Sequence, residues 1–356
     1  MSKQKSSVPD LLITIPTVLL ICLGILVIYS SDPKLALQQA TIAIIGLFLY
    51  WFFSSIEIEI YQDYLKYLYF GILALLIIVF ILGIETRGSI RWIPLGPFQL
   101  QPSEFAKPIL ILILAKFWSD NKSSWINIIK SIIIVLPVGV LIFRQPDLGT
   151  TLTIVMIWFS MLIGSNIGVI KLLLILFLSS TLAPIGWLFL KDYQRFRIIS
   201  FLSPEKDPLG VGYNAIQSTI AVGSGGIMGR GLGRGTQSRL QFLPEFRTDF
   251  IFASIAEEFG FVGSITLIFL YSVIIGRSLK IISNTDRPFN SLVVVGVLGM
   301  LFFQIIVNIG MNIGLLPITG ITLPLLSYGG SSLLVTLICL GFIASISKFI
   351  HVTKGV

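Results

Sequence analysis

The chain has 356 residues, of which 55% are hydrophobic and 12% are charged, and its formal net charge is +8 at pH 7. Soluble globular domains carry about 25% charged residues, so this composition excludes a soluble globule and indicates a protein of the lipid bilayer. The one histidine is His351, and Cys22 and Cys339 both lie in apolar runs. Catalytic triads and histidine zinc sites outside the tail, and disulfide frameworks, are therefore excluded. If the protein carries out acid–base catalysis, the proton must be transferred by a carboxylate, a lysine or a tyrosine side chain.

A helix needs about 20 predominantly apolar residues to cross a bilayer. The first apolar run is too long for a signal peptide and no small-x-small cleavage site follows it, so we count it as a span. We predict an all-α polytopic membrane protein, one integral membrane domain over residues 1–356. Its ten transmembrane helices are expected at about 11–30, 36–54, 63–84, 104–119, 125–143, 148–165, 167–190, 249–276, 288–314 and 327–349.

The distribution of Lys and Arg in the short loops predicts that both termini lie in the cytoplasm. With this orientation twelve basic residues fall on the cytoplasmic side, against five in the short outer loops, which are Lys34, Arg87, Arg91, Lys107 and Arg144. Residues 191–248 then form a large extracytoplasmic loop between the seventh and eighth spans. Its own basic residues do not count against the orientation, because long loops cross the membrane largely regardless of charge.

The basic residues in the loops on the predicted extracytoplasmic side indicate an anionic ligand. Arg87 and Arg91 stand in T-R-G-S-I-R-W-I, Lys107 follows Q-P-S-E-F-A, and Arg144 stands in F-R-Q-P-D-L-G. Arg and Lys bind phosphate oxygens, so a basic surface beside the lipid headgroups suits a substrate with an anionic, lipid-borne head. Binding of anionic lipid without any chemistry is the alternative.

Asp249 opens the eighth span directly after the outer loop. One interpretation is a helix N-cap or a first-turn acid that the helix dipole favours. The other is a functional carboxylate at the membrane surface, which could act as the general base for a sugar hydroxyl or hold a divalent cation. The local sequence leaves both open.

Further polar residues stand inside apolar runs. Gln304, Asn308 and Asn312 recur every four residues and form a stripe on one face of the ninth span. We expect them to form hydrogen bonds between helices, and secondarily to line a cavity. Glu257 and Glu258 place carboxylates inside an apolar span, which is unfavourable in free energy. Either a functional role or an ion pair with Lys or Arg would explain their presence.

The glycine-rich run Gly223–Gly235 lacks both the strand–helix context of a dinucleotide fold and the G-K-[ST] of a P-loop. It predicts tight backbone packing or a re-entrant segment at the membrane surface. The preceding Y-N-A-I-Q-S-T-I-A-V is amphipathic enough to lie along that surface.

Four separated motifs carry a family resemblance that covers essentially all ten predicted spans. They are R-W-I-P-L-G-P-F-Q-L-Q-P-S-E-F-A-K, R-Q-P-D-L-G-T, F-L-P-E-F-R-T-D-F-I-F-A-S-I-A-E-E-F-G and L-P-L-L-S-Y-G-G-S-S. In this order they resemble the shape, elongation, division and sporulation (SEDS) family of RodA and FtsW. G-T-Q-S-R-L-Q-F-L-P-E and the short termini are more similar to the RodA members. The family usually has His where this chain has Arg247.

The resemblance implies a peptidoglycan glycosyltransferase of the bacterial cytoplasmic membrane, with its active site facing outside, that serves cell elongation and shape. Such an enzyme polymerises lipid II with inversion at the donor anomeric carbon and releases undecaprenyl diphosphate. A class B penicillin-binding protein is the implied partner, and a divalent cation, Mg²⁺ or Mn²⁺, the implied cofactor; no nucleic acid is involved.

The resemblance also assigns residues. It makes Asp249 the catalytic residue, the same carboxylate whose chemistry makes it a candidate metal ligand, and it places Glu104 and Lys107 at important positions of the Q-P-S-E-x-x-K motif. Together with the basic outer residues, the expected substrate-binding set is Arg87, Arg91, Glu104, Lys107, Arg144, Arg197 and Glu245.

Two other functions fit a polytopic protein of this kind. A lipid II flippase needs charged groups along a path through the membrane midplane, whereas here the charge concentrates at the outer face. A non-catalytic scaffold that recruits cell-wall enzymes needs no Asp249.

Overall fold

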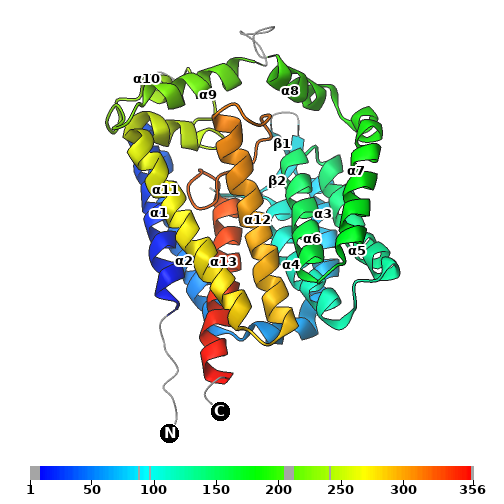
Figure 1. Cartoon of the computed structure of the whole chain (residues 1–356). Helices are drawn as coiled ribbons and strands as arrows, with labels where there is room; N and C mark the ends of the chain where they lie inside the picture. The colour runs from blue at the N-terminus through cyan, green and yellow to red at the C-terminus, as the bar shows by residue number, and fades with distance from the viewer. Residues whose placement is uncertain (1–8, 87–88, 96–97, 204–211, 240–241, 354–356) are drawn as a thin grey trace.

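The computed structural model describes residues 9–86, 89–95, 98–203, 212–239 and 242–353. Arg87, one of the predicted substrate-binding residues, lies outside them. The chain is a bundle of roughly parallel and antiparallel helices (Figure 1). The main ones are α1 (Leu11–Ser31), α2 (Pro33–Ser55), α3 (Leu65–Leu82), α4 (Pro102–Asp120), α5 (Trp125–Arg144), α6 (Leu148–Gly164), α7 (Val169–Phe189), α11 (Ile251–Asn284), α12 (Pro288–Asn312) and α13 (Gly330–Thr353).

Seven helices of the described chain are long and apolar enough to cross a membrane. They are α1, α2, α5, α11, α12, α13 and the segment Ile58–Ile81, which joins the short 3₁₀ helix η1 (Ile58–Tyr64) to α3. The other three predicted spans correspond to α4, α6 and α7. The apolar parts of α6 and α7 are shorter, Leu148–Gly164 and Val169–Leu182, and α4 carries four charged residues.

Lipid-facing and core-facing helices differ plainly in burial. In α13, 83% of the most apolar stretch of the helix is buried inside the bundle. In α11 the corresponding share is 22%. α7, at the edge of the bundle in Figure 1, exposes large apolar side chains such as Ile170, Phe177 and Phe189. An apolar surface of this extent suits contact with lipid.

The all-α prediction missed a small antiparallel sheet between α3 and α4. It consists of β1 (Ile84–Thr86), β2 (Ser89–Leu95) and β3 (Phe98–Leu100), in the order β1-β2-β3, and it packs against α3, α4 and α13. Strands of three to seven residues are too short for a clear alternation in the sequence. The pairing satisfies backbone groups of the connection between α3 and α4.

The predicted outer loop of residues 191–248 also has regular structure. It contains α8 (Asp192–Leu202), α9 (Tyr213–Ser224) and α10 (Thr236–Arg239). These three helices cross the end of the bundle that also carries the sheet, opposite to the start of α1 and the end of α13 (Figure 1). α9 packs against α11 and α12, so this segment is built onto the bundle.

The glycine-rich run packs backbone to backbone against a break in α11, which confirms the prediction of tight packing. The break is at Gly260, whose φ is 66° and ψ −157°. Arg230 N donates to Glu257 O at 2.9 Å, and Gly231 N donates to Glu258 O at 3.0 Å. The run thereby satisfies carbonyl groups that the interrupted helix leaves without an intrahelical partner.

The side chains of the two buried glutamates serve the same junction. Glu257 Oε1 accepts from Gln237 N at 2.9 Å, and Glu258 Oε1 accepts from Ser30 Oγ at 2.8 Å. Neither carboxylate is among the residues that line the cavity described below. These contacts favour a structural role, in which a backbone N–H and a serine hydroxyl donate to the two carboxylates.

A pair of glycine substitutions tests this packing. A Cβ built on Gly225, the C-cap residue of α9, would lie 1.9 Å from Ala256 O, whereas a Cβ on Gly223, in the last turn of α9, meets nothing within 4 Å. Gly225→Ala should lower the free energy of unfolding by about 1–3 kcal/mol through overpacking. Gly223→Ala should leave it unchanged or raise it by up to about 1 kcal/mol. Thermal unfolding of both purified variants in detergent measures the difference; equal midpoints would contradict the packing.

Candidate functional site

A cavity of about 1180 Å³ lies among the helices, with walls from α2, α4, α6, α12, the sheet, Arg197 of α8 and residues 245–249 and 319–334. It brings together most of the residues that the sequence singled out: Arg91, Glu104, Lys107, Arg197, Glu245 and Asp249. Arg144 is exposed at the C-terminal end of α5 and does not line the cavity. Asp147, three residues later in the same motif, is buried and does line the cavity, so the two neighbours lie in different environments.

Asp249 precedes α11 and is half-buried. The N-cap residue of α11 is Phe250, which makes no side-chain cap hydrogen bond, so the N-cap interpretation of Asp249 is wrong. The Asp249 carbonyl accepts hydrogen bonds from Asn308 Nδ2 at 2.9 Å and from Asn312 Nδ2 at 3.1 Å. Two members of the polar stripe on α12 therefore fix the backbone that carries this carboxylate.

The two carbonyls before Asp249 are fixed as well. Tyr328 N donates to Arg247 O at 2.8 Å, and Ser327 Oγ donates to Thr248 O at 2.6 Å. Three consecutive carbonyl groups, at residues 247–249, are thus held by donors from α12 and from the segment before α13. Such a turn has little freedom to move its side chains relative to the cavity wall.

Arg197 converges with Asp249 on one point of the cavity. A Cβ built on Gly320 would lie 3.6 Å from Arg197 Nη1 and 3.6 Å from Asp249 Oδ2. Gly320 has a φ of 76°, a left-handed conformation that glycine adopts without steric cost. A guanidinium group and a carboxylate from separate elements therefore face the same space.

Arg247, where the resembling family usually has His, binds the corner between α1 and α2. Its Nε donates to Ser31 Oγ at 3.0 Å, and its Nη1 lies 3.6 Å from Asp32 Oδ2. Its guanidinium group lies 4.7 Å from the centroid of the Phe246 ring. These contacts tie the turn that carries Asp249 to the first helical hairpin.

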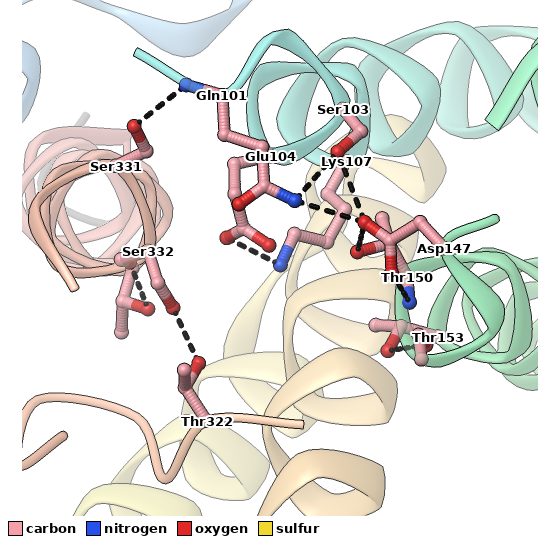
Figure 2. A network of polar contacts seen from close by, with 12 residues as sticks. Gln101, Ser103, Glu104, Lys107, Asp147, Thr150, Thr153, Thr322, Ser331 and Ser332 are labelled. Atoms are coloured by element: carbon pink, nitrogen blue, oxygen red, sulfur yellow. Dashed lines mark hydrogen bonds and ion pairs between the residues drawn. The ribbon is translucent and has the colours of Figure 1, made fainter. Parts of the chain in front are cut away.

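Asp147 is a site residue that the sequence interpretation did not single out, although it stands in the R-Q-P-D-L-G motif. It caps α6 by accepting from Thr150 N at 3.1 Å, and it accepts from Gln101 Nε2 at 2.8 Å. Arg91 Nη1 lies 3.5 Å from its Oδ1. Figure 2 shows the contacts of Asp147 with Gln101 and Thr150, between α13 on one side and α6 on the other.

Glu104 and Lys107 form a buried ion pair in the first turns of α4. Lys107 Nζ lies 2.7 Å from Glu104 Oε2, and the two side chains are 2% and 9% exposed, respectively. They project from α4 into the same network (Figure 2). Because the glutamate offsets the lysine charge, this wall of the cavity carries little net charge.

Comparison with known proteins agrees with this geometry. The FTSW_RODA_SPOVE family model, described as "Cell cycle protein", matches residues 8–351. The chain is 39% identical to "Peptidoglycan glycosyltransferase MrdB" of Escherichia coli (strain K12) over 342 residues, which cover 93% of this chain and 92% of that protein. It is 37% identical to "Stage V sporulation protein E" of Bacillus subtilis (strain 168), over 98% of this chain and 99% of that one.

The chain belongs to the SEDS family. It is a multi-pass membrane protein and a peptidoglycan glycosyltransferase.

Solved structures extend the match to the fold. A chain in "Structural coordination of polymerization and crosslinking by a peptidoglycan synthase complex" superposes with a TM-score of 0.85 at 32% identity and covers 96% of this chain and 98% of its own. The rod shape determining protein RodA of Thermus thermophilus superposes with a TM-score of 0.72 at 30% identity, covering 95% and 96%. This SEDS enzyme therefore shares the helical arrangement of its relatives over nearly its whole length.

The charges around the cavity of this SEDS enzyme are balanced. Among the described residues that line it, the basic ones are Arg91, Lys107, Arg197 and Arg247, and the acidic ones are Glu104, Asp147, Glu245 and Asp249. The sequence alone predicted a predominantly basic surface. It does not show that acids such as Asp147 pair with basic residues that are distant along the chain, such as Arg91.

The residues at the cavity also bear on the cation that the resemblance implies. The described chain contains no group of three or more His, Cys, Asp or Glu side chains arranged to hold a metal. Mg²⁺ is commonly bound by one or two carboxylates together with substrate phosphates. Asp249 and Glu245, which both line the cavity, fit that second kind of site.

Proposed function

We propose that this SEDS enzyme polymerises lipid II, with Asp249 as the general base. The observation that carries the proposal is the half-buried Asp249 carboxylate, fixed through its backbone at the wall of a large cavity and facing Arg197. A base must reach the proton that it removes with a defined geometry. The turn at residues 247–249 supplies such a geometry.

The proposed reaction is one in-line displacement. Asp249 takes the proton of the 4-hydroxyl of the acceptor N-acetylglucosamine, and that oxygen forms a bond with C1 of the donor N-acetylmuramic acid. The bond from C1 to the diphosphate breaks, and undecaprenyl diphosphate leaves with the electron pair. Attack opposite to an α-linked phosphate gives a β-glycoside, so the anomeric carbon is inverted.

Charge that develops on the leaving diphosphate needs fixed cationic groups. Arg197 shares the space with Asp249, and Arg91 and Arg247 line the same cavity. From the predicted substrate-binding set we keep Arg91 and Arg197 in the proposed clamp and leave out Arg144, which lies outside the cavity; Arg247 is added because it lines the same cavity. A divalent cation held by Asp249 and Glu245 would add positive charge at the diphosphate.

We further propose ten spans with both termini in the cytoplasm, so that the cavity faces outside. In support, α8, α9, α10 and the sheet lie at the end of the bundle opposite to the start of α1 and the end of α13 (Figure 1), and the Lys and Arg of the short loops favour the same orientation. The three additional spans are α4, α6 and α7.

Thiol labelling of intact cells tests this orientation. Thr219 in α9 and Ser283 in α11 are both exposed, and Cys22 and Cys339 can be replaced by Ala to give a thiol-free background. A membrane-impermeant reagent should label Thr219→Cys and leave Ser283→Cys unlabelled until the cells are lysed. The reverse pattern would contradict the proposed orientation.

The names of the relatives support a role in cell elongation and shape, with a class B penicillin-binding protein as partner. One relative is a rod shape determining protein, and another solved chain belongs to a complex that coordinates "polymerization and crosslinking". A partner that forms cross-links complements a chain that forms glycan strands. Neither a flippase nor a scaffold needs a carboxylate held in this way, and neither makes polymer from lipid II in detergent, where no bilayer remains.

Replacement of Asp249 tests the mechanism. Asp249→Asn keeps the size of the side chain but removes the base, so polymerisation of labelled lipid II by the purified protein should fall by at least about 100-fold. Asp192→Asn is the control, because Asp192 is 88% exposed and lies in α8 away from the cavity lining. It should polymerise at the wild-type rate. Near wild-type activity of a folded Asp249→Asn variant would remove the proposed mechanism.

A further inference from the structure

The polar stripe on α12 divides into two parts with different surroundings. Asn308 Nδ2 donates to Asp249 O and Ile321 O, at 2.9 and 2.7 Å. Asn312 Oδ1 accepts from Ala253 N at 3.1 Å, and its Nδ2 donates to Asp249 O. Both asparagines hold the protein's own backbone, and Asn312 Nδ2 also lies 3.4 Å from Asn308 Oδ1. Gln304, the third member of the stripe, has different surroundings.

Gln304 lines the cavity and is 3% exposed. Within the described residues its Oε1 is a buried atom with no hydrogen-bond partner. A buried amide without a partner destabilises a folded protein, so it calls for an explanation such as a ligand. The side chain lies on the face of α12 that carries Asn308 and is directed to the cavity, where a ligand could supply the missing donor.

Gln304 stands one helical turn from Asn308, which is about 6 Å along the helix axis. Since Asn308 contacts the Asp249 backbone, Gln304 lies deeper in the bundle than the proposed base by a distance comparable to one sugar ring. An acceptor sugar whose 4-hydroxyl meets Asp249 would therefore extend its opposite side toward Gln304.

The pairing of other polar side chains in the cavity wall and the chemistry of the Gln304 amide favour a neutral group. Lys107 is paired with Glu104 at 2.7 Å, and Thr153 Oγ1 donates to Gly149 O at 2.9 Å; all three of these side chains line the same cavity. The carbonyl oxygen of Gln304 would repel the oxygens of a diphosphate. A primary amide presents one acceptor and donors side by side, the pattern complementary to a secondary amide.

We propose that Gln304 is a specificity-determining residue, whose side-chain amide receives a hydrogen bond from the acetamido N–H of the acceptor N-acetylglucosamine. The inference rests on the proposed function and adds the recognition of one substrate group to it. A site built to bond an N–H rejects the analogue that lacks it, because the partner in the protein is then left buried and unpaired.

The experiment compares lipid II with an analogue in which an ester oxygen replaces the acetamido N–H of N-acetylglucosamine. Each is polymerised by the full-length wild-type protein and by Gln304→Met, a near-isosteric variant without donor or acceptor. Wild type should prefer lipid II by about tenfold in kcat/KM. Gln304→Met should lose about tenfold on lipid II and show no preference between the two substrates.

The control is Asn290→Leu. Asn290 lies near the other end of α12, outside the cavity lining, and its Oδ1 is likewise buried without a partner among the described residues. Asn290→Leu should keep the wild-type preference for lipid II. Thermal unfolding adds a second readout: Gln304→Met should unfold no earlier than wild type, because an apolar group replaces an unpartnered amide.

The outcomes separate this inference from the function on which it rests. If wild type polymerises both substrates equally, or Gln304→Met keeps the preference, the recognition by Gln304 is wrong and the proposed reaction stands. If Gln304→Met unfolds earlier and loses the same factor on both substrates, Gln304 is structural and the inference is again overturned. If wild type polymerises neither substrate, the proposed function falls and the inference falls with it.

Discussion

The hydrogen bonds to the carbonyls of residues 247–249 are the constraint on which the site depends. This turn precedes a helix that runs into the membrane, and a carbonyl without a partner in such surroundings is costly. Its carbonyl groups accept from Asn308, Asn312, Ser327 and the Tyr328 N–H. Because each donor belongs to a packed element, satisfying the backbone also fixes the position of the Asp249 carboxylate.

The break in α11 has a related consequence. Gly260 interrupts the helix only a few turns after Asp249, and the glycine-rich run pairs with the carbonyls on its near side. Residues 251–259 are thereby joined to the glycine-rich run by backbone hydrogen bonds.

Much of the framework could be predicted from the sequence, for identifiable reasons. Apolar runs locate helices because the bilayer demands length and hydropathy together. The four motifs located Asp249, Glu104 and Lys107, which the fold brings to one cavity. α4 was expected as a span, yet its charge is tolerated because Glu104 and Lys107 face each other inside the bundle.

The remaining features depend on pairings that a single sequence does not contain. The strands of the sheet are too short to show periodicity, and the partners of Asp147 and Arg247 come from distant elements. Gln304 and Asn308 look equivalent in the stripe, since both are buried amides one turn apart. Only the arrangement of residues 245–249 and 319–334 shows that one holds the backbone and the other faces the cavity.

The turnover of Asn308→Ala at saturating lipid II tests most directly whether this backbone constraint positions the proposed base. The account predicts that kcat falls by roughly 10- to 100-fold, because a small displacement of a reacting group is costly in rate, while KM stays within about threefold, since Asn308 does not contact the substrate. A folded Asn308→Ala variant with the wild-type kcat would contradict it.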